Sequence, residues 1–130
     1  MQEEIDRALK SKLIENTWIV KKNMGWSIRS FFTDNKISHV AIYGLGALGL
    51  RLYDDLEDSG LKIDYAIDQT VTEEKQSMVE FPLLSSSSDS FPQTELIIVT
   101  PVQYYWDIVK LLEQKTDIPI VSLEDVVAYG

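Results

Sequence analysis

The sequence predicts an α/β domain built on one doubly wound, mostly parallel sheet, with an N-terminal helical extension. Short runs rich in β-branched residues alternate with amphipathic helical patterns along residues 37–130. A glycine-rich turn joins the first of these runs to the helix that follows it. The 130 residues suffice for one hydrophobic core. Right-handed crossovers between such strands predict the strand order 3-2-1-4-5.

Residues 1–36 are expected to form the helical extension, and residues 37–130 the α/β domain. Helical spacing predicts one helix over residues 3–20 and a second, short helix that ends near Asp34. In the first, Ile5, Ala8, Leu9 and Leu13 fall at helical spacing with charged residues between them. The extension is also rich in aromatic residues, which favour cores and interfaces alike. They could pack on the sheet or form a dimer or partner surface: Trp18, Trp26, Phe31 and Phe32.

The run His39–Tyr43 has the composition of a buried strand and ends at a glycine. Residues 47–59 have leucines spaced by four, which predicts a helix that stops at Gly60. A second strand is expected from Leu61 to Ile67. The span from residue 39 to residue 68 therefore matches the length of about 30 residues typical of a βαβ unit.

Residues 69–93 have the weakest pattern, and we expect a loop there with one helical turn and a short strand at Met78–Phe81. Glu95–Thr100 is a strong strand pattern, followed by Pro101 and a helix that carries Tyr105, Ile108, Val109 and Leu112 on one face. A last strand is expected at Ile118–Val121, after which Ser122 can cap a final turn with Asp125 in a capping box.

The turn Gly44-Leu45-Gly46-Ala47-Leu48-Gly49 matches the fingerprint of dinucleotide-binding, or Rossmann, βαβ units. In that motif Gly44 permits the tight turn, Gly46 lets a pyrophosphate approach the backbone, and Gly49 lets the helix pack near the strand. The helix that begins near Ala47 would point its free amides and its positive dipole end at the anion. Arg51 could assist the anion or simply lie solvated on the helix.

Asp68 follows Gly44 by 24 residues and Gly49 by 19, at the end of the second strand. An acid at this distance can accept hydrogen bonds from the adenosine ribose and disfavours a 2′-phosphate, so we expect NAD in preference to NADP. The alternative is an aspartate that serves only the turn. Thr100 and Pro101 lie at the topological switch point and could line the nucleotide site, or could be a plain strand-to-helix junction.

Composition excludes several classes of function. The net charge of −9 argues against nucleic-acid binding. Without cysteine, and with His39 as the only histidine, there is neither a thiolate nor a multi-histidine metal site. His39 is expected to be structural, and Asp64 to face solvent or an edge. The acidic first residues and the lack of a long apolar run suggest a soluble, cytoplasmic protein without membrane insertion.

No catalytic constellation is visible in the sequence. Dehydrogenases and epimerases need an acid or base beside the reacting carbon. The Tyr-x-x-x-Lys pair of short-chain dehydrogenases is missing, since Tyr104 and Tyr105 stand at the wrong distance from Lys110.

Several motifs together resemble small Rossmann-like domains encoded in bacterial capsule and exopolysaccharide gene clusters. The resemblance covers roughly residues 20–127 and is carried by Val40–Gly49, Arg51–Tyr53, Tyr65–Asp68, Ile97–Pro101, Pro119–Asp125 and the lead-in Gly25–Ile28. It implies a role around surface-polysaccharide assembly but supplies no reaction.

Three functions remain open on this basis. The first is a module that binds NAD or a nucleotide-sugar and serves a polysaccharide-biosynthesis enzyme as an accessory or regulatory domain. The second is the cofactor-binding part of a nucleotide-sugar oxidoreductase or epimerase that another chain or a symmetry mate completes. The third is an interaction module that has lost its ligand and uses the N-terminal helices to form a homodimer or to dock.

Overall fold

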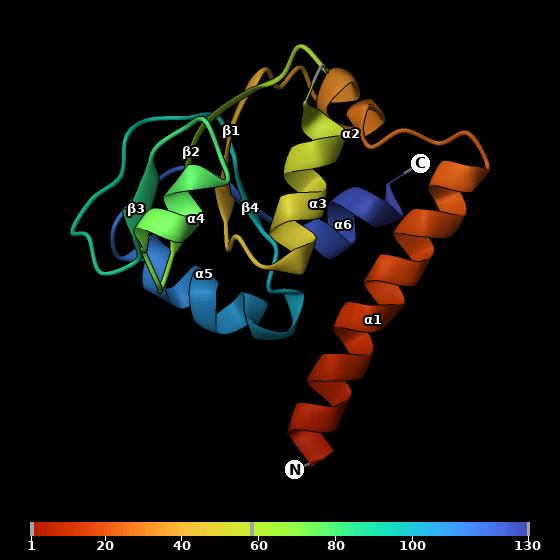
Figure 1. Ribbon diagram of the computed structural model, residues 1–130, viewed down its shortest axis with the longest axis horizontal. Helices are drawn as coiled ribbons and strands as arrows, with labels where there is room; N and C mark the ends of the chain where they lie inside the picture. Colours follow the sequence, from red (N-terminus) through yellow and green to blue (C-terminus); the bar gives the residue numbers. More distant parts are fainter. Residues whose placement is uncertain (1, 58, 130) are drawn as a thin grey trace.

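The computed structural model describes residues 2–57 and 59–129, with the side chains described from residue 12 onward. Its centre is a five-stranded sheet in the order β3-β2-β1-β4-β5, in which every neighbouring pair is parallel (Figure 1). The predicted fold class and strand order are therefore confirmed. The strands are β1 His39–Tyr43, β2 Lys62–Asp68, β3 Leu83–Ser85, β4 Ile97–Val99 and β5 Ile120–Ser122.

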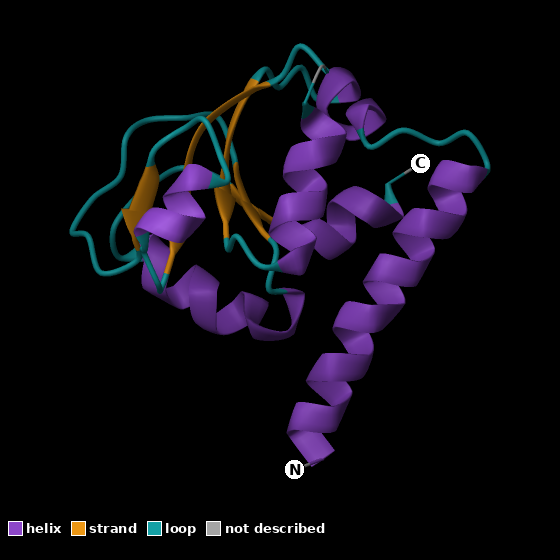
Figure 2. Ribbon diagram, viewed as in Figure 1, coloured by secondary structure: helices purple, strands orange, loops and turns teal. Residues whose placement is uncertain are grey.

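Helices surround the sheet, as the purple ribbons in Figure 2 show. Within the described residues, no helix has both the length and the apolar character needed to cross a membrane. The helices are α1 Gln2–Asn23, α2 Arg29–Asp34, α3 Ala47–Leu56, α4 Glu73–Ser77, the 3₁₀ turn η1 Val102–Tyr104, α5 Tyr105–Glu113 and α6 Leu123–Ala128.

Two apolar clusters, one on each face of the sheet, form the core. Alternate residues of a strand point to opposite faces. From β1, Val40 and Ile42 belong to the cluster beneath α3 and α6, whereas Ala41 and Tyr43 belong to the cluster beneath α5. β1 is paired on both sides, and all of its residues after His39 are buried.

The N-terminal extension packs on the α3 side of the same core. The Trp18 side chain is fully buried and its Nε1 donates to Asp55 Oδ2 at 2.8 Å. Lys21 Nζ donates to the Val127 carbonyl oxygen at 2.7 Å. Of the two possibilities for the aromatic residues, packing holds for Trp18 and Phe32, which are buried in the core. Phe31 and Trp26 are partly buried against the same core.

The predicted first helix is present, but Leu13, one of the residues whose spacing predicted it, does not face the core. Leu13 is 54% exposed, and Ile14 and Trp18 face the body instead. The helix carries two apolar stripes, so helical spacing alone could not tell which one faces the core. The side chains of Ile5, Ala8 and Leu9 lie outside the described ones. α1 also runs three residues further than predicted, to Asn23.

The strand predicted at Met78–Phe81 was wrong. The third strand is Leu83–Ser85, and it starts after Pro82, whose carbonyl oxygen accepts from the Ala66 amide at 2.9 Å. Val79 and Phe81 are instead buried in the α3-side core. The helical turn expected in this segment is α4. Near the chain end, Ser122 Oγ accepts from the Glu124 amide at 3.1 Å, so Ser122 is the predicted cap, but its bond goes to Glu124 and not to Asp125 as in a capping box.

Candidate functional site

A cavity of about 540 Å³ lies at the carboxyl edge of the sheet, where β1, β2 and β4 end. We call it the carboxyl-edge cavity. Strand order decides its position, because β1 lies between β2 and β4 and the chain reverses direction across the sheet there. Its lining comes from the glycine turn, the end of β2, α4 and the start of α5: Tyr43, Gly44, Gly46, Asp68, Gln69, Lys75, Pro101, Tyr104, Asp107, Ile108 and Leu111.

The predicted glycine turn follows β1 directly. Gly44 has a φ of +92°, a conformation that glycine adopts at little cost. A Cβ atom there would lie 2.8 Å from Thr100 Oγ1. A Cβ atom on Gly49 would overlap the carbonyl oxygen of Gly44. The first and third glycines thus let strand, turn and helix approach closely, as the motif predicts.

Gly46 differs from both, because a Cβ atom built there meets no atom within 4 Å. It is the N-cap of α3, and its carbonyl oxygen accepts the first helical bond, from the Leu50 amide at 2.9 Å. Among the described residues, no group accepts from the amides of residues 46–49. These are the donors that a helix leaves unsatisfied at its amino end, and they attract anions.

Asp68 ends β2 beside this turn. Its Oδ2 accepts from the Leu45 amide at 2.9 Å, and its Oδ1 accepts from the Thr70 amide at 3.0 Å. Lys75 Nζ lies 3.3 Å from Oδ1. Burial raises the pKa of the Asp68 carboxyl, but the two amides and Lys75 outweigh burial and hold the pKa below its ordinary value. The carboxylate is therefore ionised, and Leu45, predicted to cradle the ligand, donates to Asp68.

The Tyr43 side chain forms part of the cavity wall and is 2% exposed. Its hydroxyl oxygen makes no hydrogen bond of good geometry to any described residue, although the Ser86 side chain lies near enough to act on its pKa as a hydrogen-bonding neighbour. Burial raises the pKa of this hydroxyl, Ser86 nearby opposes the rise, and the Asp68 charge adds to it. A buried hydroxyl without a partner costs free energy, and such groups call for an explanation. Sequence patterning assigned Tyr43 only to a buried strand.

For Thr100 and Arg51, the side chains make contacts within the fold, in line with the alternatives that need no ligand. The Thr100 hydroxyl is buried, 2.9 Å from the Tyr43 carbonyl oxygen and 2.8 Å from that of Gly44, so it braces the turn. Pro101, next to it, does line the cavity. Arg51 pairs with Glu15 of α1, Nη2 to Oε1 3.5 Å, which removes it as an aid to an anion at the turn.

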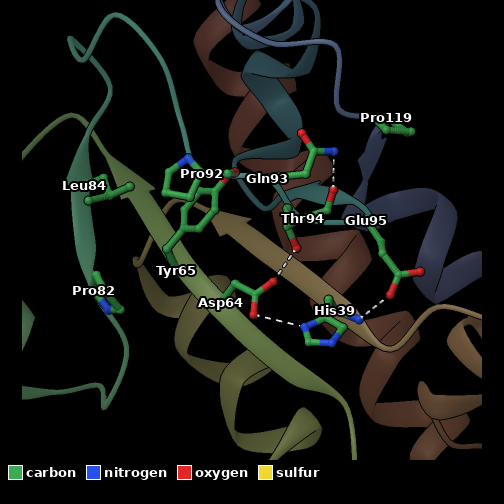
Figure 3. Close-up of a pocket in the computed structure, with 10 residues that line it drawn as sticks. All are labelled: His39, Asp64, Tyr65, Pro82, Leu84, Pro92, Gln93, Thr94, Glu95 and Pro119. Atoms are coloured by element: carbon green, nitrogen blue, oxygen red, sulfur yellow. Dashed lines mark hydrogen bonds and ion pairs between the residues drawn. The ribbon is translucent and has the colours of Figure 1, made fainter.

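A larger cavity, about 890 Å³, lies at the opposite, amino edge of the sheet (Figure 3). We call it the amino-edge cavity. Asp64 lies at its centre: Oδ1 is 3.1 Å from His39 Nδ1, and Oδ2 accepts from Thr94 Oγ1 at 2.9 Å. Asp64 was expected to face solvent or an edge, but both of its oxygens are bonded within the fold. The structural role expected for His39 fits this pair.

The other polar groups of the amino-edge cavity also bond to nearby chain. Glu95 Oε1 accepts from the His39 amide at 3.0 Å and from the Ser38 hydroxyl at 3.0 Å. Tyr65 donates its hydroxyl to the Pro92 carbonyl oxygen at 2.7 Å. The polar groups here hold strand ends together, so the larger cavity makes the weaker candidate site.

Within the described part of the chain, no group of three or more His, Asp or Glu side chains is arranged to hold a metal ion. Comparisons with protein-family models, with curated proteins and with solved structures found no match for this chain. The function is therefore argued from the geometry of the carboxyl-edge cavity.

Proposed function

We propose that this chain is a nucleotide-binding module that holds the diphosphate of a dinucleotide or nucleotide-sugar in the carboxyl-edge cavity. The observation that carries the proposal is the row of amides at residues 46–49, which have no acceptor among the described residues and lie beside open space at Gly46. Amides at the start of a ten-residue helix, together with its dipole, favour an anion. A volume of 540 Å³ is typical of small-molecule sites.

Asp68 supports a ribose beside the diphosphate. A carboxylate has about four acceptor positions, and the Leu45 amide, the Thr70 amide and Lys75 use three of them. One position remains for a ribose hydroxyl. The negative charge of Asp68 favours NAD over NADP, although Lys75 weakens that preference by pairing with it.

The Tyr43 hydroxyl gives a second reason to expect a ligand. It is buried and without a partner at the wall of the same cavity. Because the hydroxyl oxygen is itself buried, a ligand or a water molecule would supply the missing hydrogen bond only after the Tyr43 ring turned toward the cavity. Retaining an unsatisfied group at this point is consistent with a functional rather than a structural role.

The biological setting of the proposal rests on the resemblance of the turn and strand motifs to domains of capsule and exopolysaccharide gene clusters. On that basis the chain would serve a surface-polysaccharide enzyme as an accessory or regulatory module. The described side chains at the cavity include no arrangement of acid, base and nucleophile that we can assign to a reaction.

Calorimetric titration of the full chain with NAD, NADP and UDP-sugars tests the proposal. We expect at least one to bind with a Kd below about 1 mM. Gly46→Val puts a branched side chain in the open space and should weaken that binding at least about tenfold. The same change should cost only about 1 kcal/mol of stability, since a Cβ there meets no neighbour.

Thr94→Val, which removes a hydroxyl at the amino-edge cavity, is the control and should leave the affinity unchanged. Absence of binding by every ligand, or equal affinity in wild type and Gly46→Val, would refute the assignment of the turn.

A further inference from the structure

The charges around the carboxyl-edge cavity are unequal along its length. At the β2 end, Asp68 and Lys75 neutralise one another, with 3.3 Å between Oδ1 and Nζ. At the α5 end lies Asp107, whose carboxylate has no hydrogen-bond or ion-pair partner among the described residues. Lys75 is the one cation among the described lining residues. The cavity is therefore close to neutral at one end and negative at the other.

The position of Asp107 suits a negatively charged side chain. It lies in the first turn of α5, where the helix dipole favours a negative charge. It is also exposed to solvent. Tyr104, Ile108 and Leu111 also line the cavity and add aromatic and aliphatic surface to it.

This arrangement discriminates between two kinds of nucleotide diphosphate. ADP or UDP ends in a phosphate that carries two negative charges near pH 7 and would face Asp107. In NAD, ADP-ribose or a nucleotide-sugar, the second phosphate carries one charge and is esterified to a neutral, hydroxylated ring. A carboxylate accepts hydrogen bonds from such hydroxyls, and these charge-assisted bonds are stronger than neutral ones.

We infer that the cavity selects diphosphates esterified at both ends, and that Asp107 is the residue that determines this specificity by receiving the hydroxylated ring and repelling a terminal phosphate. The inference rests on the proposed function, because it assumes that the diphosphate lies at the amides of α3. The inference gives a role to the α5 end of the cavity, about which the glycine motif says nothing.

The test compares ADP-ribose with ADP, and UDP-glucose with UDP, by calorimetry on the full chain without divalent cations. The two members of each pair share the same nucleoside diphosphate. The ratio of their affinities therefore measures only the effect of esterifying the terminal phosphate. We expect wild type to prefer the diester at least about fivefold, the effect of one extra unit charge about 4 Å away in water. The preference should shrink in 0.5 M salt, because salt screens an exposed charge (about 10 Å Debye length at 0.1 M).

Asp107→Asn should narrow the preference by strengthening ADP or UDP binding about fivefold and weakening diester binding. Glu113→Gln is the matched control: it removes the same charge from the same helix, but Glu113 does not line this cavity, so the ratio should not change. An unchanged ratio in Asp107→Asn, or equal wild-type affinity for both members of a pair, overturns the inference alone. Failure of every probe to bind overturns the proposed function together with it.

Discussion

The two edges of the sheet treat their polar groups in opposite ways. At the amino edge, Asp64 bonds to His39 and Thr94, and Tyr65 donates to the Pro92 carbonyl oxygen. At the carboxyl edge, the amides of residues 46–49 and the Tyr43 hydroxyl have no partner among the described residues. By volume alone, the amino-edge cavity would be the better candidate for a binding site. The unsatisfied donors instead favour the carboxyl-edge cavity. A binding site is better recognised by what its groups still lack than by its volume.

The largest expected effect tests how closely the carboxyl edge is packed. Gly49→Ala puts a Cβ onto the carbonyl oxygen of Gly44, and backbone atoms on both sides leave little room to adjust. We expect a loss of about 3 kcal/mol or more in the free energy of unfolding, measured by urea denaturation. Gly46→Ala, three residues away in the open part of the turn, should cost less than about 1 kcal/mol. An equal loss of stability in Gly49→Ala and Gly46→Ala would contradict the close approach of the helix at Gly49 to the turn at Gly44.

A second comparison substitutes one aspartate at each edge. Asp64→Ala removes the acceptor for Thr94 and the partner of His39, and should cost about 2 kcal/mol of stability with no effect on ligand affinity. Asp68→Ala frees the Leu45 amide and should weaken the binding of a ribose-containing ligand about tenfold as well as destabilise the fold. Denaturation and titration of both variants provide the check. Loss of binding in Asp64→Ala would move the site to the amino edge.

The same tyrosine substitution should have opposite signs at the two edges. Tyr43→Phe removes a buried hydroxyl that has no partner, so the ligand-free protein should gain up to about 1 kcal/mol. Tyr65→Phe removes the donor to the Pro92 carbonyl oxygen and should cost about 1 kcal/mol. Thermal and urea unfolding without ligand measure both. Destabilisation by Tyr43→Phe would show that its hydroxyl is satisfied in solution.

The smallest expected effect is on the stability of the fold at acidic pH. The folded-state pKa of Asp68 lies below its ordinary value, so the ionised carboxyl stabilises the fold above that value. This stabilisation is lost as the pH falls through the folded-state pKa. In Asp68→Asn the free energy of unfolding should therefore fall less steeply between about pH 5 and pH 2 than in wild type. Parallel pH profiles for the two proteins would contradict the bonds to Asp68.

Much of the fold follows from the sequence because its signals are local. The β1–α3 unit combines a β-branched run, three spaced glycines and leucines four apart, and each of these is read within a few residues. The third strand was misplaced because Val79 and Phe81 form as good a short apolar pattern as Leu83–Ser85. Pairing with β2 decides between the two, and that contact is not encoded locally.

The candidate site was predictable only in its glycine half. Gly44, Gly46 and Asp68 stand at spacings that the motif specifies, and they do line the cavity. Lys75 and Asp107 come from helices that sheet order, not sequence distance, brings to the same edge. Their residue types suit any solvated helix position, so nothing in the sequence distinguished them. The bracing role of Thr100 was missed for the same reason, since its partner carbonyls are more than 50 residues away.

The Thr100 hydroxyl has a consequence for assembly during folding. It fastens the loop after β1 to the far end of β4, and these two segments meet only when the sheet has received its fourth strand. A peptide that contains the whole glycine turn but stops before residue 100 would keep the motif and lose the contact that shapes it. The shape of the glycine turn is therefore a property of the completed sheet rather than of its first helix.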